Sequence, residues 1–276
     1  MMTALLLSIL FCLRKNLDFT LLTYRQLLET LKECGYTFIT FKQYCQTPAD
    51  KLPERFIILR HDVDLRAKNS LATAQIEHEF GLQASYYFRV VPESNQPDII
   101  RKIVALGHEV GYHYEDMTIM SGDTEKALAH FQQQLSYFRQ YYPISTICMH
   151  GAPTSQWDGR TLWKHIDYRE FGIIGEPYFD VDFSQVFYLT DTGRRWDGYK
   201  VSVRDKIPQY QDLWTEKGWV YRRSSQIIEA AKKTTLPSRI MITTHPQRWT
   251  NNPLLWIEEM LLQTAKNTIK RVFLVK

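Results

Sequence analysis

The chain has 276 residues, a formal net charge of +4 and a pI near 8.7. Hydrophobic residues make up 44% and aromatic residues 13%, which supports a core of barrel size and excludes an intrinsically disordered protein. Lysines and arginines are spread along the chain without a dense basic run or a nucleic-acid motif, so no nucleic-acid partner is expected. The four cysteines form no CxxC pair, which predicts free thiols and a cytoplasmic location.

The first apolar stretch, TALLLSILFCL at residues 3–13, has the length of a signal-peptide core. Its basic residues, Arg14 and Lys15, follow the stretch instead of preceding it, and no small-x-small cleavage site is present. The stretch is also too short to cross a hydrocarbon core of ~30 Å as a helix. We therefore expect no stable membrane span, and treat residues 1–16 as an extension that is either a peripheral helix or a weak membrane contact. Residues 17–276 are expected to form a single domain.

From residue 17, helical periodicity and strand-like runs alternate with short breaks, which predicts an α/β fold with a largely parallel sheet. The expected helices cover residues 23–36, 67–81, 97–107, 123–142 and 225–233, and a stretch after 253. The expected strands cover residues 55–59, 84–91, 108–113, 145–149, 171–175, 186–190 and 239–244. Residues 196–219 give no clear assignment. About seven such units predict a (β/α) barrel that is distorted or incomplete.

Acids and histidines occupy the carboxyl ends of these strands. They are Asp62, Asp64, His113, Glu115, His150, Glu176, Asp191 and His245. In a (β/α) barrel this end of the strands forms the active-site face, so side chains from distant parts of the sequence are expected to meet in one pocket.

The segment RHDVD at residues 60–64 places two acids at the end of an apolar strand. In extended backbone Arg60, Asp62 and Asp64 share one face, while His61 points to the other. Two carboxylates facing one space predict a catalytic base beside a metal ligand. The alternative is that Asp62 or Asp64 caps the helix beginning near Ala67.

Histidines end three of the later strands. His108 and His113 are five residues apart and cannot chelate together as in a zinc protease, so His113 is the ligand candidate, with Glu115 on the same face. In TICMHGAP and IMITTHPQRW, His150 and His245 each end a strand and precede a turn. The alternative is a histidine hydrogen-bonded to the turn backbone for His150, and a purely structural loop for His245.

The residues around His245 also indicate substrate binding. Arg248 and Trp249 follow this histidine closely, and an indole face can stack on a pyranose ring, so these residues indicate a sugar-binding edge. Asp191, in YLTDTGRRWDG, is expected to orient a polar substrate or a neighbouring catalytic group, with a surface ion pair as the alternative. The chain has no GxSxG, P-loop or GxGxxG motif, which argues against a serine hydrolase or a nucleotide-binding enzyme.

Together, RHDVD, GHEVGYHYE (107–115), MHGAP (149–153) and HPQRW (245–249) resemble motifs of the polysaccharide deacetylase family, the NodB-like carbohydrate esterases, and more closely a divergent branch of it. The resemblance covers residues 17–250, with several motifs in the family's order. It implies a distorted (β/α) barrel of about seven strands. It also implies removal of acetyl groups from N-acetylated sugars, with zinc or a similar divalent ion as cofactor and a carbohydrate as the binding partner.

The resemblance further implies roles for single residues. Asp62 matches the catalytic base, Asp64 the metal-binding aspartate, His113 the first metal histidine and His245 the general acid. Asp191, Arg248 and Trp249 are then expected to bind the substrate, Arg248 steadying either the sugar or Asp62.

The chain also departs from the family pattern. A valine separates the family's adjacent acids, the common Arg-x-Pro segment is replaced by MHGAP, and Met117 stands where the second metal histidine is expected. Because catalytic zinc generally keeps three protein ligands, Asp64 and His113 need a third, for which we choose His150, with Glu115 as the alternative. Met117 also motivates a second hypothesis, a non-catalytic glycan-binding or polysaccharide-assembly protein. A metal hydrolase acting on another amide or ester is a third.

Overall fold

The computed structural model describes residues 17–271, so the predicted extension 1–16 lies outside the described part of the chain. Seven strands form one sheet in the order β5-β4-β3-β2-β7-β6, with β1 beside β2, and every pairing is parallel. The strands are β1 (Thr37–Ile39), β2 (Phe56–Val63), β3 (Ser85–Phe88), β4 (Glu109–Tyr114), β5 (Ile147–Met149), β6 (Phe187–Thr190) and β7 (Arg239–Thr244).

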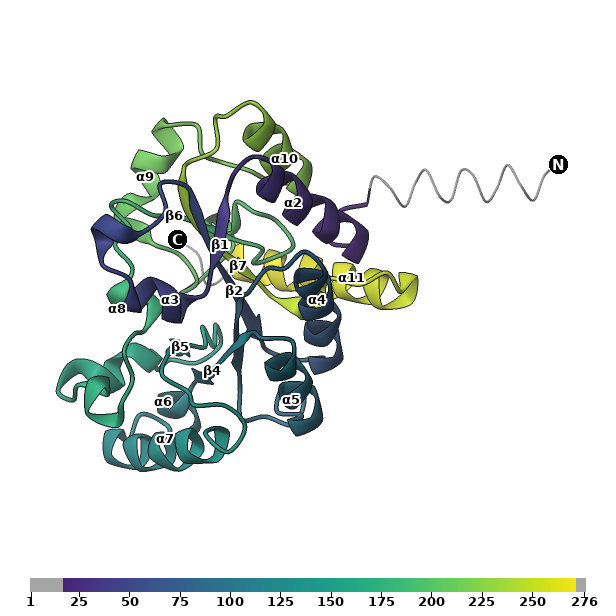
Figure 1. Ribbon diagram of the computed structural model, residues 1–276. Coiled ribbons are helices and arrows are strands. Elements are labelled where there is room, and N and C mark those ends of the chain that lie inside the picture. The colour runs from purple at the N-terminus through teal and green to yellow at the C-terminus, as the bar shows by residue number, and fades with distance from the viewer. Residues whose placement is uncertain (1–16, 272–276) are drawn as a thin grey trace.

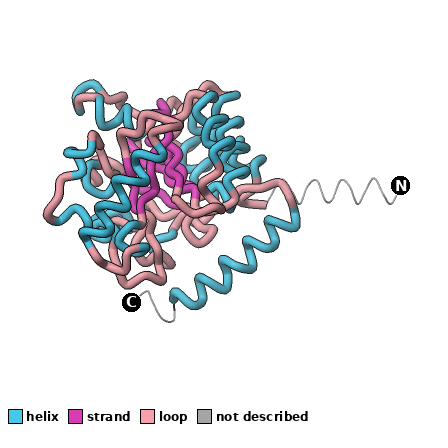
Figure 2. Tube along the Cα trace, turned by 90° about the horizontal axis from the view of Figure 1, so that it is seen from below, coloured by secondary structure: helices cyan, strands magenta, loops and turns pink. Residues whose placement is uncertain are grey.

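Helices surround this sheet, and the long α11 runs along one side of the molecule (Figures 1 and 2). The α-helices are α2 (Leu21–Glu33), α3 (Phe41–Gln46), α4 (Ala67–Glu79), α5 (Pro97–Ala105), α6 (Asp116–Ile119), α7 (Thr124–Phe138), α8 (Pro177–Asp180), α9 (Pro208–Glu216), α10 (Ser224–Lys232) and α11 (Pro253–Ile269). Short 3-10 helices are η1 (Ala49–Lys51), η2 (Gly159–Lys164), η3 (Tyr168–Phe171), η4 (Gly198–Lys200) and η5 (Pro246–Arg248). Within residues 17–271, none of the helices combines the length and apolarity needed to cross a membrane.

The sheet curls without closing. Within the described residues no ladder joins β5 to β6, so the strands form a half-barrel with an opening between these two edges. The predicted α/β fold with about seven strands is confirmed, and the distortion expected of the barrel is this opening. Because all strands run parallel, their carboxyl ends lie on one side of the sheet.

Two local predictions differ from the structure. The strand expected over 171–175 is wrong, because this stretch begins in η3 and contributes only a single bridge between Gly175 and Thr146. Conversely, β1 and α3 were not predicted. A strand of three residues is too short to show periodicity, and α3 begins with a capping box between Thr40 and Gln43 rather than with an apolar pattern.

The face of β2 opposite the two acids holds a buried polar network. His61 points to this face as predicted, and its Nε2 lies 2.7 Å from Oε1 of Glu77 on α4. Tyr24 and Tyr86 donate hydrogen bonds to the same carboxylate, and the Thr244 hydroxyl lies 2.6 Å from Nδ1 of His61. This network ties α2 and α4 to the middle of the sheet.

Replacing Glu77 by glutamine is expected to lower the free energy of unfolding by ~3 kcal/mol at pH 7, because it removes the carboxylate from a fully buried carboxylate–imidazole pair. Burial alone would raise the pKa of Glu77, but His61 outweighs burial and the pKa is lowered. The carboxylate therefore stabilises the fold above its unfolded pKa of about 4.3, and this stabilisation is lost as pH falls through the lowered pKa. Urea unfolding at pH 7 and below pH 4 measures the difference in the free energy of unfolding between variant and wild type. This difference should be smaller below pH 4, and an equal difference at both pH values would contradict this role.

Candidate active site

A cavity of about 600 Å³ lies at the carboxyl ends of the strands. Its wall includes the five side chains predicted to carry the chemistry, which are Asp62, Asp64, His113, His150 and His245. They come from the ends of β2, β4, β5 and β7. The structure thus brings together residues that are up to 183 positions apart.

Asp62 is held in place by the preceding arginine on the same face of β2. Nε and Nη2 of Arg60 donate to the two Asp62 oxygens over 2.8 and 2.6 Å, and both side chains are buried. Burial alone would raise the pKa of Asp62, but Arg60 and then His113 outweigh it and lower the pKa. Neither acid caps the following helix, because Arg66 occupies the N-cap of α4 without a side-chain cap hydrogen bond.

Asp64 carries an unsatisfied buried oxygen in the cavity wall. Its Oδ1 is buried and has no hydrogen-bond partner among residues 17–271, while Nε2 of His113 and Nε2 of His150 each lie 3.5 Å away. The other oxygen, Oδ2, accepts a hydrogen bond from Gln247 over 3.1 Å. Asp64, His113 and His150 are called the donor set below.

The hydrogen bonds behind the two imidazoles fix which ring nitrogen carries the proton. Nδ1 of His113 lies 2.9 Å from the Cys148 carbonyl oxygen, and Nδ1 of His150 lies 2.8 Å from Oε2 of Glu115. Both partners only accept, so the protons are assigned to Nδ1 and a lone pair is left on each Nε2 in the neutral rings. These lone pairs face an unpaired carboxylate oxygen. Such an arrangement calls for a positive charge between the three atoms.

The chemistry of the donor set suits a divalent metal ion. One carboxylate oxygen and two imidazole nitrogens are donors that zinc accepts, and three protein ligands leave one position open for water or substrate. Burial would raise the pKa of Asp64, yet the three nearby imidazoles lower it well below its usual range, so the carboxylate stays ionised.

A second group of donors lies beside the first. Ligand atoms of Asp62, His113 and Cys148 all lie within 4.8 Å of one another. Arg60 already donates hydrogen bonds to both oxygens of Asp62. Because Asp64 has an unpaired oxygen and Asp62 does not, we favour the donor set around Asp64.

Glu115, the alternative third ligand, lies behind His150 rather than beside it. Its carboxylate accepts two hydrogen bonds from Arg89, over 2.8 and 2.9 Å, as well as the bond from His150. This arrangement orients the imidazole, which is how carboxylates support metal-bound histidines. The geometry therefore favours His150 as the ligand.

Replacing Glu115 by glutamine is accordingly expected to weaken zinc binding by ~10- to 100-fold, because the charged acceptor behind His150 is lost. Competition with a coloured chelator measures this change. The exposed Glu125→Gln variant is the control and should bind like wild type. Unchanged affinity in Glu115→Gln would show that the carboxylate does not support a metal ligand.

His245 faces the donor set from β7. Its Nδ1 lies 2.7 Å from Oδ1 of Asp191, and its Nε2 lies 3.9 Å from Oδ2 of Asp64. Burial and the charge of Arg248 favour the neutral ring, but Asp191 and Asp64 outweigh them and raise the pKa of His245. The imidazole is thus suited to carry a proton on Nε2 toward the cavity.

Asp191 and Trp249 do not line the cavity, so the predicted contact of Trp249 with a substrate requires correction, whereas the contact of Asp191 with His245 fits the other alternative stated for it, orientation of a neighbouring group. Both are fully buried, and the indole Nε1 donates to Oδ2 of Asp191 over 2.8 Å. Arg248 also donates to this carboxylate, and it does line the cavity. The indole faces pack against Phe19, Tyr24 and Trp196 instead of being open to a sugar. These residues position His245.

Asp205 is an acid of the cavity wall that was not predicted. Asp205 accepts hydrogen bonds from Thr190 over 2.6 Å and from Tyr178 over 3.1 Å, and also from Tyr188 and Thr192. Burial would raise its pKa, but His245 and other groups lower it, so it stays ionised. It lies in the stretch 196–219, where no periodicity or motif indicated a role.

No family model matches the chain, and no curated protein matches it. A comparison with solved structures finds a CE4 family pseudoenzyme from Bacillus anthracis, with a TM-score of 0.39 and 10% identity. The match covers 79% of this chain and 66% of the other, so this chain spans slightly less than two thirds of that protein. The residue roles below rest on the geometry of this chain alone.

Proposed function

We propose that the protein is a metal-dependent carbohydrate deacetylase, which hydrolyses the acetamide bond of an N-acetylated sugar. The observation that carries this proposal is the buried, unpaired Oδ1 of Asp64, with two imidazole nitrogens 3.5 Å away. The motif resemblance names the substrate class. The donor set would hold a divalent ion, for which zinc is the best chemical match.

When bound, such an ion lowers the pKa of a coordinated water and polarises the acetyl carbonyl. Asp62 acts as the base that takes the proton of the attacking water. Arg60 donates one hydrogen bond to each oxygen of Asp62 and so orients the carboxylate. Because a carboxylate oxygen has two lone pairs, each oxygen keeps one lone pair that can accept a proton. The lowered pKa of Asp62 keeps it ionised before the reaction.

His245 completes the reaction as general acid. The sugar amine leaves only if it gains a proton, and Nε2 of His245 holds one toward the cavity under the influence of Asp191. The amide C–N bond breaks as this proton moves to the nitrogen, giving the free amino sugar and acetic acid, which then loses its proton to water to become acetate. Water gives one proton to Asp62, and the leaving amine receives one proton from His245, so the two proton transfers balance.

One observation keeps a non-catalytic glycan-binding protein as the second candidate. Met117 stands where the resemblance expects a second metal histidine, and it is buried in α6 away from the cavity wall. This candidate retains the cavity and requires neither metal nor turnover.

Release of acetate from N-acetylglucosamine oligomers distinguishes the two candidates. The deacetylase is expected to release acetate after loading with zinc, to stop when a chelator removes the metal, and to recover when zinc returns. Acetyl esters of the same sugars, assayed in parallel, test the wider class of metal hydrolases. Glycan binding without acetate release from amides or esters, at any metal loading, would support the binding protein.

A further inference from the structure

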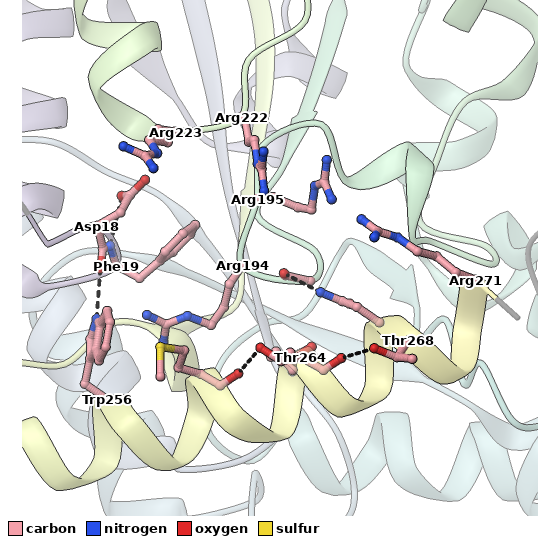
Figure 3. A pocket seen from close by; sticks show the side chains of 14 residues that line it. Asp18, Phe19, Arg194, Arg195, Arg222, Arg223, Trp256, Thr264, Thr268 and Arg271 are labelled. Atoms are coloured by element: carbon pink, nitrogen blue, oxygen red, sulfur yellow. Dashed lines mark hydrogen bonds between the residues drawn. The ribbon is translucent and has the colours of Figure 1, made fainter.

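A second cavity, of about 370 Å³, lies beside the adjoining face of α11. Gln263 lines both cavities, but the second one contains none of the proposed catalytic residues. Five arginines line it, and they come from three separate stretches of the chain (Figure 3). They are Arg194 and Arg195 after β6, Arg222 and Arg223 before α10, and Arg271 after α11. We call this cavity the arginine pocket.

Most of the positive charge in the arginine pocket is not neutralised by neighbouring acids. Arg195 pairs with Asp197, and Asp18 accepts hydrogen bonds from the backbone and hydroxyl of Ser224. Among residues 17–271, the other four arginines have no carboxylate oxygen within 4.0 Å. Among the described residues, the lining of the pocket holds five arginines and a single acid, Asp18, so positive charge is in excess.

Arg194 is built into the wall of the pocket. Its guanidinium lies between the rings of Phe19 and Trp256, at 5.0 and 4.5 Å from their centroids. Its Nη1 is buried and has no hydrogen-bond partner in the described structure. Burial lowers the pKa of this arginine to about 10, which still leaves it charged at neutral pH. A fixed, charged donor without an acceptor is the state expected of an anion site before its ligand binds.

The other side-chain donors of the pocket are mostly used within the fold. The hydroxyls of Thr264 and Thr268 donate to backbone oxygens of α11, and the Asn267 amide donates to the Gly193 carbonyl oxygen. Within residues 17–271 the Asn267 and Gln263 amide oxygens accept no hydrogen bond, so the pocket keeps two free acceptors, while its free donors are mainly guanidinium groups. Figure 3 shows Arg195 between Arg222 and Arg271, so donors from distant segments border one space.

We propose that the arginine pocket binds a diphosphoryl group. Guanidinium forks match phosphate oxygens in geometry, and arginine is the preferred residue for such bidentate contacts. A single carboxylate would neutralise only one of the arginine charges, whereas a diphosphate carries several negative charges in a compact group. This inference does not depend on the deacetylase activity.

The test is titration of the full chain with sodium pyrophosphate at constant ionic strength, followed by calorimetry, with orthophosphate and sulfate as weaker anions. Pyrophosphate is expected to bind at least about 10-fold more tightly than either. Arg222→Ala and Arg271→Ala, which alter exposed side chains, should each weaken binding by ~10-fold or more, because each removes charged hydrogen bonds. Arg222→Lys should recover only part of the loss, because it keeps the charge without the fork.

Arg101→Ala is the matched control, because Arg101 is an exposed arginine elsewhere on the surface, paired with Asp98. It should bind pyrophosphate like wild type. Equal binding of pyrophosphate and sulfate, or equal binding by Arg222→Ala, Arg271→Ala and the control, would overturn the proposal. Thermal unfolding of each variant confirms that the fold is retained.

Two further arms identify the source of the diphosphoryl group. The first uses vesicles of phosphatidylcholine that carry a diphosphate-bearing lipid, because α11 also exposes Leu254, Ile257 and Leu261. The second uses a nucleoside diphosphate in solution. Vesicle binding that pyrophosphate displaces indicates a lipid headgroup, and nucleoside diphosphate binding without vesicle binding indicates a soluble ligand. Both outcomes support the site. If the protein binds neither the vesicles nor the nucleoside diphosphate, and also fails to bind pyrophosphate, the proposal is overturned.

Discussion

Replacing His245 by alanine is expected to lower kcat for deacetylation by ~10² to 10⁴-fold while leaving the metal content unchanged. The loss follows because Nε2 of His245 holds the proton that the leaving amine requires. The metal stays because this nitrogen lies 3.9 Å from Asp64, on the far side of the carboxylate from the unpaired Oδ1. Steady-state kinetics and metal analysis on the same preparation measure both quantities.

The exposed His165→Ala variant serves as the control and should retain full activity. Asp191→Asn adds a second measurement, the pH dependence of activity, which would not change if Asp191 had only a structural role. Because Asp191 raises the pKa of His245, activity that needs the protonated ring is lost as pH rises through that pKa, and the variant should lose it at lower pH. Wild-type turnover in His245→Ala would remove this residue from the mechanism.

Replacing Asp64 by asparagine is expected to have the largest effect on the metal site. The amide is neutral, so the charge facing the two imidazole lone pairs is lost, and zinc affinity should fall by more than ~100-fold. Activity should fall with it. Elemental analysis after gel filtration should find about one zinc ion per chain in wild type and almost none in the variant.

Asp98→Asn, at an exposed site on α5, is the control for this measurement and should keep its zinc. Stoichiometric zinc in Asp64→Asn would mean that another group of donors holds the ion. The alternative set of Asp62, His113 and Cys148 would then be the first to examine, and a Cys148→Ser variant would test it.

The meeting of Asp62, Asp64, His113, His150 and His245 was predictable from the sequence because each ends a predicted parallel strand. Parallel strands present their carboxyl ends at one edge, so strand assignment alone placed these side chains together. The alternation along RHDVD likewise predicted that Arg60 would face Asp62 and that His61 would turn away.

The sequence did not reveal which side chains after the strands would face the cavity. Trp249 follows η5, which turns the chain back so that the indole packs against Phe19 and Trp196 in the core. Exposure after a turn depends on tertiary packing, which no local pattern records. Asp205 was missed for the related reason that its partners come from other segments, such as Tyr178 before β6 and Thr190 within it.

The central claim is that a metal ion sits between the three residues of the donor set. A crystal structure of the zinc-loaded protein, with anomalous scattering recorded at the zinc edge, tests it most directly. We predict one anomalous peak within about 2.0 to 2.2 Å of Oδ1 of Asp64 and Nε2 of both His113 and His150. A zinc-saturated crystal with no peak at Asp64, or with its peak at other ligands, would contradict the account.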